Sequence, residues 1–244
     1  GPGGKITKAD VAKAAAAAAA APAGPKAQRI ALTPMRRVIA ERMAQSKYSA
    51  PHYYVTMEVD MAAAAGFRTS LPGFKPSYND LVLFATAKAI RRFPAVNVRW
   101  AGDAIEELAD INLAFAVALP SGLVTPVVRN VDTKSLEQIH AEARALGDKA
   151  RDGKLAPDDY SGHTFTISNL GAFGVDQFTA IINAPDTAIL AVGQIKDRPV
   201  VIDGGIHIRP IMNLTLSSDH RAIDGAVAAQ FMAVLQEILE QADF

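Results

Sequence analysis

Four side chains that can carry charge fall within six residues in the segment Ser217-Ser-Asp-His-Arg-Ala-Ile-Asp-Gly225. Apolar runs precede and follow it, which predicts a strand-to-helix turn whose side chains converge on a cleft. Because an imidazole titrates near neutral pH, His220 is a candidate general base, with Asp224 or Arg221 fixing its environment. The structural alternative is an ion-paired turn with Arg221 between two aspartates. The segment by itself favours neither interpretation.

Other common catalytic and metal sites are not predicted. The histidines, at positions 52, 140, 163, 207 and 220, are too scattered for a helical metal pair and have no carboxylate cluster beside them, so we expect no metal. The absence of cysteine excludes disulfides, thiolate metal sites and a cysteine nucleophile, and no Gly-x-Ser-x-Gly elbow is present. We interpret His140 and His163 as surface residues, His207 as part of a hairpin and His52 as structural.

The composition favours a globular protein without a nucleic-acid or membrane partner. Its 244 residues carry 25 Lys and Arg against 25 Asp and Glu, so no basic excess would attract nucleic acid or an anionic membrane. No apolar run reaches the ~18–20 residues that a membrane span requires, and the N-terminus lacks the layout of a signal peptide. We expect neither partner.

The elements that must position the turn belong to a long α/β domain. Residues 1–12 are interpreted as the remnant of a small helical module, residues 13–29 as an Ala/Pro-rich tether, and residues 30–244 as one domain. Apolar residues at helical spacing predict helices from Pro34 and at 81–92, 135–152 and 226–239. Strands are predicted at 53–60, 164–169, 187–192 and 211–218, and apolar runs at 110–119 and 122–129 predict a hairpin or a sharply turned strand. This order predicts a mixed sheet with helices on it.

The motif Asp219-His220-Arg221-x-x-Asp224-Gly225 resembles the His-x-x-x-Asp-Gly signature shared by chloramphenicol acetyltransferase and the acyltransferase cores of 2-oxo acid dehydrogenase complexes. Further stretches resemble those cores in the same order: MRRVIAERMAQSK at 35–47, PHYY at 51–54, SYNDLVLFATAKAI at 77–90, PAVN at 94–97, SGLVTPVVRN at 121–130 and TFTISNLGAFG at 164–174. The leading GPGGKITKADV resembles the end of the peripheral subunit-binding domain that precedes such cores. The resemblance implies a chloramphenicol-acetyltransferase-like α/β fold, a mixed sheet with flanking helices, assembled as a trimer.

The resemblance also implies transfer of an acyl group between a dihydrolipoyl thiol and the thiol of coenzyme A. His220 matches the family's general base, which removes the thiol proton. Ser168 matches the residue whose hydroxyl stabilises the tetrahedral oxyanion, a contribution of up to ~3 kcal/mol. Asp224 matches the acid or amide that pairs within the site, with Arg36 or Arg37 as its expected partner. Without a cysteine or a serine elbow, direct transfer in a ternary complex is expected.

For coenzyme A, the family pattern points to Arg68, Ser77, Ser168, Asn169 and Gly193. Two of these have a structural alternative, because Ser77 fits a helix cap and Gly193 fits a strand-end glycine. The lipoyl group is expected on a separate domain that this chain does not include. The stretches TFTISNLGAFG and SSDHRAIDGA look more like acetyl-transferring cores than succinyl or branched-chain ones, so acetyl is the expected acyl group.

Partners follow from the same resemblance. In the family the site lies between trimer subunits, so His220 of one chain is expected to meet Ser168 of its neighbour. Trimers assemble further into cubic or dodecahedral cores, and the expected partners are the dehydrogenase and dihydrolipoamide dehydrogenase components and the lipoyl domain. The expected location is the bacterial cytoplasm or the mitochondrial matrix. The alternatives are a core of another 2-oxo acid or acetoin dehydrogenase complex, a free-standing small-molecule acetyltransferase, or a scaffold without catalysis.

Overall fold

The computed structural model describes residues 1–19, 27–120 and 122–244 and divides the chain into two units, Gly1–Pro34 and Met35–Phe244. In the first unit, α1 (Lys8–Ala19) follows the 3-10 turn η1 (Pro2–Gly4). The Thr7 backbone N–H donates to Asp10 Oδ2 at 2.8 Å and caps the start of α1. Helix α1 crosses the expected boundary between residues 12 and 13. Residues 20–26 of the expected tether lie outside the described residues.

The second unit alternates helices and strands. Its helices are α2 (Pro34–Ser49), α3 (Ala62–Ser70), α4 (Tyr78–Arg92), α5 (Leu136–Arg151) and α6 (Gly225–Glu240). Its strands are β1 (His52–Asp60), β2 (Val98–Trp100), β3 (Ile105–Glu107), β4 (Leu113–Phe115), β5 (Val117–Leu119), β6 (Gly122–Val124), β7 (Val127–Val128), β8 (Phe165–Asn169), β9 (Ala188–Ile202) and β10 (Gly205–Asp219). Short 3-10 turns are η2 (Pro94–Val96), η3 (Val131–Thr133), η4 (Pro157–Tyr160) and η5 (Gly171–Phe173).

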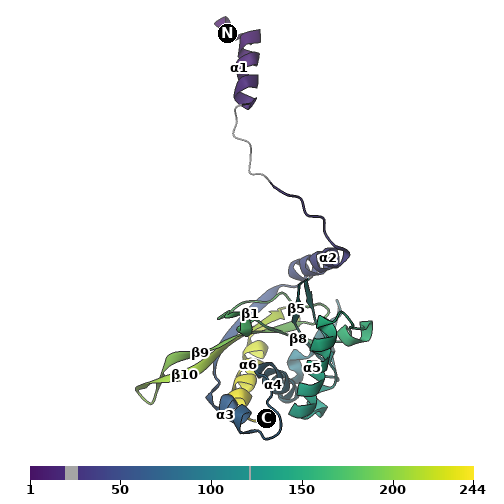
Figure 1. Ribbon diagram of the computed structural model, residues 1–244, viewed down its shortest axis with the longest axis vertical. Coiled ribbons are helices and arrows are strands. Elements are labelled where there is room, and N and C mark those ends of the chain that lie inside the picture. The colour runs from purple at the N-terminus through teal and green to yellow at the C-terminus, as the bar shows by residue number, and fades with distance from the viewer. Residues whose placement is uncertain (20–26, 121) are drawn as a thin grey trace. The chain divides into compact units, whose positions relative to one another are not determined.

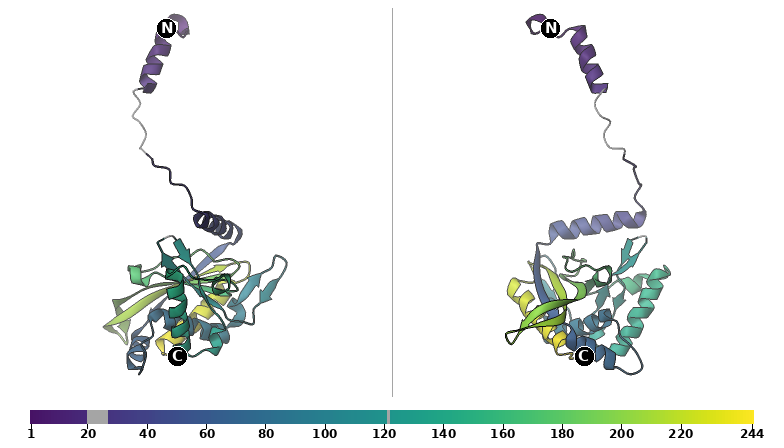
Figure 2. Two further views of the ribbon diagram at one scale, coloured as in Figure 1. Left: turned by 45° about the vertical axis from the view of Figure 1, so that its right-hand side comes forward. Right: turned by 60° about the vertical axis from the view of Figure 1, so that its left-hand side comes forward.

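A six-stranded mixed sheet in the order β1-β10-β9-β8-β4-β7 forms the centre of this unit. Strand β8 runs parallel to β9 and β4, and the remaining pairs are antiparallel. Helices α4, α5 and α6 lie on one face of the sheet and α2 lies on the opposite side (Figures 1 and 2). A mixed sheet with flanking helices confirms the expected fold class.

The hydrophobic core between the sheet and its helices holds α6 in place, and α6 follows the turn that carries His220. Phe165 of β8 contacts Phe231 of α6 with ring centroids 5.8 Å apart, and both side chains are fully buried. Burial of an aromatic side chain contributes about 1.5–3 kcal/mol. Because α6 begins five residues after His220, these contacts hold the far side of the turn in place.

Most predicted elements are present, with corrections to their length. The predicted helices at 81–92, 135–152 and 226–239 are α4, α5 and α6, and the apolar runs around Pro120 form the β5–β6 hairpin. The predicted strands at 187–192 and 211–218 are too short, because β9 and β10 continue as a hairpin that projects from the sheet (Figure 1). Helix α3 and the β2–β3 hairpin are not among the predicted elements.

The end of α2 packs on the sheet face that lies opposite α4–α6. Ser46 Oγ donates to the carbonyl oxygen of Ile182 at 2.6 Å, beside a buried cluster of Ala50, Ile182 and Ile189. Further towards its start, α2 exposes apolar side chains that the sequence places on one face: Met35 is 42% exposed and Val38 is 47% exposed. Much of this apolar face is therefore open in the single chain.

Candidate active site

His220 lies in the turn between β10 and α6, and its side chain is exposed. Its backbone N–H donates to the Pro51 carbonyl oxygen at 2.9 Å, and the N–H of the buried Asp219 donates to the Thr187 carbonyl oxygen at 2.8 Å. These bonds tie the turn to the segments that precede β1 and β9. The backbone at His220 is thus held on two sides while the imidazole stays accessible.

Arg221 forms an ion pair within this turn, as the structural interpretation predicts. Its Nε lies 3.0 Å from Asp219 Oδ1 and its Nη2 lies 2.7 Å from Asp219 Oδ2. This hydrogen bonding raises the pKa of Arg221 above its ordinary value. The guanidinium also lies over the Trp100 ring, 5.0 Å from the centroid. The predicted second aspartate, Asp224, does not take part, so the arrangement with Arg221 between two aspartates is wrong.

Asp224 is the N-cap of α6. Its Oδ1 accepts a hydrogen bond from the Val227 backbone N–H at 2.9 Å, which satisfies one of the free donors at the helix start. Capping links the position of Asp224 to the helix that follows the turn. An ion pair of Asp224 with Arg36 or Arg37 stays a prediction.

Ser168 lies on β8 and faces away from α4–α6. Its strand neighbours Phe165 and Ile167 are buried in the main core, and alternation along the strand directs Ser168 to the other face. The side chain is partly buried, and its hydroxyl has no hydrogen-bond partner among the described residues. An unpaired hydroxyl of this kind is free to donate to a ligand.

One chain keeps Ser168 and His220 apart. Ser168 pairs with Ala191 of β9, and Ala191 pairs with Thr215 of β10. Asp219, the residue before His220, lies four residues further along β10, which is about 13 Å at about 3.3 Å per residue. A shared hydrogen-bonded reactant requires groups within about 3 Å of the same atoms. The two predicted catalytic side chains therefore do not meet within one chain.

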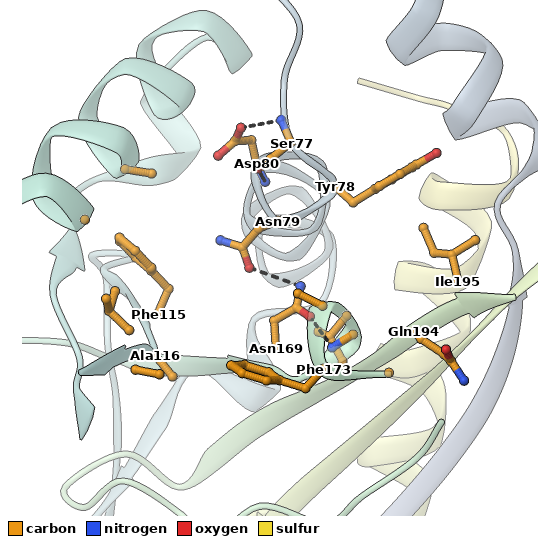
Figure 3. A pocket seen from close by; sticks show the side chains of 18 of the residues that line it. Ser77, Tyr78, Asn79, Asp80, Phe115, Ala116, Asn169, Phe173, Gln194 and Ile195 are labelled. Carbon is orange, nitrogen blue, oxygen red and sulfur yellow. Dashed lines mark hydrogen bonds between the residues drawn. The ribbon is translucent and has the colours of Figure 1, made fainter. Parts of the chain in front are cut away.

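A pocket of about 820 Å³ lies between the sheet and helices α4 and α5 (Figure 3). Three of the five residues predicted for coenzyme A line it: Ser77, Asn169 and Gly193. The other two, Arg68 and Ser168, are not among its lining residues. The structure thus brings together three segments that are far apart in the sequence.

The polar residues of the pocket are held by hydrogen bonds. Ser77 Oγ accepts a hydrogen bond from the Asp80 N–H at 3.1 Å, and Asp80 Oδ2 accepts one from the Ser77 N–H at 2.6 Å. Ser77 is therefore a helix cap, as the structural alternative predicts, and it also lines the pocket. Asn169 Oδ1 accepts from the Gly171 N–H at 2.9 Å, and Asn169 Nδ2 points to Asn79 Oδ1 at 3.4 Å (Figure 3). Both side chains are fixed before any ligand binds.

Gly193 and Arg68 have clear structural roles. A Cβ atom at position 193 would lie 2.2 Å from the Asp176 carbonyl oxygen, so the close backbone approach requires glycine. Arg68 Nε donates to the Pro76 carbonyl oxygen at 2.6 Å, and its guanidinium lies over the Tyr78 ring, 4.8 Å from the centroid. Arg68 therefore stabilises residues 76–78, which lead into the pocket.

His140 lines this pocket and its side chain is 23% exposed, so its interpretation as a surface residue is not contradicted. Its Nδ1 lies 2.8 Å from Asp80 Oδ2, and the Asp80 side chain is only 6% exposed. Arg144 and Arg151 line the same wall, one and three helical turns further along α5. Residues 4 and 11 positions apart share a helix face, so the sequence spacing of Arg144 and Arg151 from His140 already indicates that the three side chains lie on the same side of α5.

His163 is buried, so its interpretation as a surface residue is wrong. Its Nδ1 lies 2.7 Å from Asp186 Oδ1, and Thr166 Oγ1 donates to Asp186 Oδ2 at 2.6 Å. Burial raises the pKa of the Asp186 carboxyl, while its hydrogen bonds oppose that shift. His52 is structural as predicted, since its Nδ1 contacts the Ala50 carbonyl oxygen and its Nε2 accepts from the Ile182 N–H.

Residues 1–19, 27–120 and 122–244 contain no group of three or more His, Cys, Asp or Glu side chains that could hold a metal ion. They also contain no helix that is long and apolar enough to cross a membrane.

Residues 24–244 match the family of 2-oxoacid dehydrogenase acyltransferase catalytic domains. The chain is 48% identical over 219 residues to the dihydrolipoyllysine-residue acetyltransferase component of the mitochondrial pyruvate dehydrogenase complex of Schizosaccharomyces pombe. That match covers 86% of this chain and 45% of the relative, so the chain spans about half of the relative's length.

Solved structures resemble the chain over almost its whole length. Dihydrolipoamide acetyltransferase of Azotobacter vinelandii, studied for the role of one serine, one histidine and one asparagine in its mechanism, is 34% identical with a TM-score of 0.85, covering 98% of this chain and 97% of that one. The cubic core of a pyruvate dehydrogenase multienzyme complex is 35% identical with a TM-score of 0.86 and the same coverage. Chloramphenicol acetyltransferase, at 17% identity and a TM-score of 0.56 over 82% of this chain and 94% of that one, shares the fold.

Proposed function

The chain belongs to the family of 2-oxoacid dehydrogenase acyltransferase catalytic domains, and on this premise we propose that it transfers an acetyl group from a dihydrolipoyl thiol to coenzyme A. The observation that carries the proposal is the pocket in which Ser77, Asn169 and Gly193 converge. Its apolar residues suit a pantetheine chain, and the wall with Arg144 and Arg151 suits anionic phosphates.

His220 is the proposed general base. It takes the proton from the thiol of coenzyme A, and the thiolate attacks the thioester carbon of acetyl-dihydrolipoamide. The carbon–sulfur bond to dihydrolipoamide then breaks, and the departing thiolate takes the proton back from the imidazolium. Acetyl-coenzyme A and dihydrolipoamide are the products, and the base is restored.

Ser168 is the proposed oxyanion donor. Attack on the thioester places negative charge on the carbonyl oxygen, and a fixed hydroxyl aimed at that oxygen stabilises the transition state. The unpaired Ser168 hydroxyl supports this role. The Azotobacter enzyme was studied for a serine, a histidine and an asparagine, and this chain offers Ser168, His220 and, as the acid in place of the amide, Asp224.

The proposed active unit is a trimer. About 13 Å along the sheet separates the level of Ser168 from Asp219, which supports a site shared between neighbouring subunits. The exposed apolar residues Met35 and Val38 of α2 are consistent with an interface. We further propose assembly into a cubic or dodecahedral core that binds the dehydrogenase components and receives the lipoyl domain, with residues 1–12 as part of a subunit-binding domain.

A transfer assay tests this function. The wild type is expected to move acetyl groups from acetyl-coenzyme A to free dihydrolipoamide, the reverse of the physiological direction, and His220→Ala is expected to lose at least about 100-fold in rate. Succinyl and branched-chain donors should react more slowly, although a pocket separates one or two methylenes by only about 1–3 kcal/mol.

The same assay identifies the alternatives. A folded trimer with no wild-type transfer to dihydrolipoamide would contradict the proposal, and transfer to a small hydroxyl or amine acceptor instead would favour a free-standing acetyltransferase. Preference for another acyl donor would assign the chain to a different 2-oxo acid dehydrogenase complex.

A further inference from the structure

The imidazole of His220 makes no hydrogen bond within the described residues, yet one aromatic ring contacts it. Tyr53 of β1 and His220 meet edge to face, with ring centroids 4.9 Å apart and planes at 85°. This T-shaped arrangement is favoured because the positive edge of one ring meets the negative face of the other. The backbone of His220 is bound to Pro51, two residues before Tyr53. The start of β1 therefore holds both the backbone and the ring of His220.

Because Gly225 has no side chain, the Tyr53 ring can occupy the space beside its Cα atom. A Cβ atom at position 225 would lie 3.0 Å from Tyr53 Oη and 3.2 Å from ring atoms Cε1 and Cζ. Such contacts are tighter than most Cβ contacts, so a side chain at the start of α6 would require the Tyr53 ring to shift by a few tenths of an ångström. The Tyr53 ring thus lies beside both the imidazole and the first residue of α6.

We propose that Tyr53 is a positioning residue for His220, and that Gly225 keeps open the place of its ring. The ring restricts the rotation of the imidazole, so that one orientation faces the thiol whose proton it removes. This inference rests on the proposed function, in which His220 is the general base. It also assigns a physical cause to the glycine that ends the Asp219–Gly225 motif.

Four single variants of the assembled protein test the role of the ring. The kcat and the KM for coenzyme A are measured for Tyr53→Phe, Tyr53→Leu, Gly225→Ala and the matched control Tyr160→Leu. Tyr160 is similarly exposed, at 45% against 39% for Tyr53, and lies in η4. Tyr53→Phe retains the ring and should keep kcat within about twofold. Tyr53→Leu should lower kcat about threefold to tenfold, the range of an aromatic pair, with KM and the control unchanged.

The double variant Tyr53→Leu/Gly225→Ala tests whether the two residues act together. Gly225→Ala alone should lower kcat because its methyl group displaces the ring, but it should add little once leucine replaces the ring. A wild-type kcat in Tyr53→Leu, or two losses that multiply, would overturn the proposal. If size-exclusion chromatography shows that Tyr53→Leu does not assemble, Gly225→Ala decides, and an unchanged kcat in that variant overturns the proposal.

His220→Ala distinguishes failure of the inference from failure of the proposed function. Retained activity in His220→Ala would show that His220 is not the general base, and the positioning role of Tyr53 would fail with it. An inactive His220→Ala together with fully active Tyr53→Leu and Gly225→Ala would leave the proposed function intact and overturn only the positioning role.

Discussion

Gly193 lines a pocket and also has a structural role, which differs from the one that the sequence predicts. It lines the pocket proposed for coenzyme A, and its missing side chain admits the Asp176 carbonyl oxygen at a distance that no Cβ tolerates. Gly193 lies inside β9 (Ala188–Ile202), so its interpretation as a strand-end glycine is wrong, and the close approach of the Asp176 backbone is what requires glycine there. Because the Asp176 backbone packs against Gly193 in this wall of the pocket, a larger residue at position 193 is expected to lower the stability of the fold as well as to affect ligand binding.

Gly193→Ala is expected to destabilise the protein by about 1–3 kcal/mol, the usual cost of overpacking. The free energy of unfolding is measured with urea at one fixed protein concentration. Gly66→Ala is the control, because a Cβ there meets nothing within 4 Å and alanine favours the interior of α3. Equal stability of Gly193→Ala and the wild type would contradict the close approach.

Asp186→Ala is expected to cost about 1–3 kcal/mol or more, because it leaves His163 Nδ1 and Thr166 Oγ1 buried without their acceptor. Asp186→Asn should cost less, since one amide oxygen remains and a buried charge is removed. Urea unfolding of the two variants gives the order. An alanine variant at least as stable as the asparagine variant would argue against this network.

Residue roles were predictable where a local pattern carries them. Ser77 and Asp80, three positions apart, form a capping box, and Arg221 pairs with Asp219, two positions away. The surface interpretation of His163 failed because its partner, Asp186, lies 23 residues later on a different segment. Such burial depends on how the chain folds back, which no local pattern contains.

At the scale of elements, hydrophobic periodicity predicts the helices and strands that face the core. It does not predict strand segments whose side chains are exposed. Helices α4 and α5 were placed correctly, because each has a capping serine and a buried face. In the outer part of the β9–β10 hairpin, the interpretation of His207 as part of a hairpin is confirmed, but the length of the two strands is not predicted, since Val201, Ile206 and Ile208 are 76–80% exposed. Its strands are held by pairing with each other, which composition alone does not show.

Capping by Asp224 connects α6 to the turn of His220. Asp224→Ala should destabilise the protein by about 0.5–2 kcal/mol, the usual cost of a lost N-cap, whereas Asp224→Asn should retain most of the stability. Thermal unfolding of both variants, with the transfer assay alongside, separates capping from chemistry. Wild-type stability in the alanine variant would refute the cap. A stable but inactive asparagine variant would assign the carboxylate a further role in the site.

At the scale of the whole molecule, Asp243 joins the C-terminal residues to α4. Its Oδ1 lies 2.5 Å from Lys88 Nζ, and it also pairs with Arg92. The hydrogen bond from Lys88 lowers the pKa of Asp243 below its ordinary value of 3.8. For a carboxyl whose pKa is lowered by folding, the stabilisation is present above the ordinary pKa and is lost as the pH falls through the lowered one.

Asp243→Asn should therefore lower the melting temperature at pH 7, and the difference from the wild type should shrink as the pH falls below 3.8. Differential scanning calorimetry across this range measures it. Asp203→Asn, at the exposed tip of the β9–β10 hairpin, is the control and should show no such trend. A pH-independent difference for Asp243→Asn would contradict the ion pairs.

The trimer is expected from the family resemblance alone, because hydrophobic periodicity does not indicate which apolar faces stay exposed in the folded chain. Periodicity places Met35 and Val38 of α2 on one face, but only the exposure of that face in the folded chain indicates that it is available to a neighbour. Likewise, Ser168 and His220 read as one site in the family pattern, and the strand register separates them within one chain. The proposed trimer accounts for both observations, because a neighbouring subunit would cover α2 and supply the second catalytic side chain.

Mixed trimers test this central claim most directly. His220→Ala and Ser168→Ala are co-expressed at equal levels, and acetyl transfer to free dihydrolipoamide is compared with each single variant. In random closed trimers, about one quarter of the shared sites would pair an intact histidine with an intact serine of its neighbour. Recovery of about one quarter of wild-type activity is the predicted result. Activity no higher than that of the single variants, in trimers shown to be mixed, would contradict a site built from two chains.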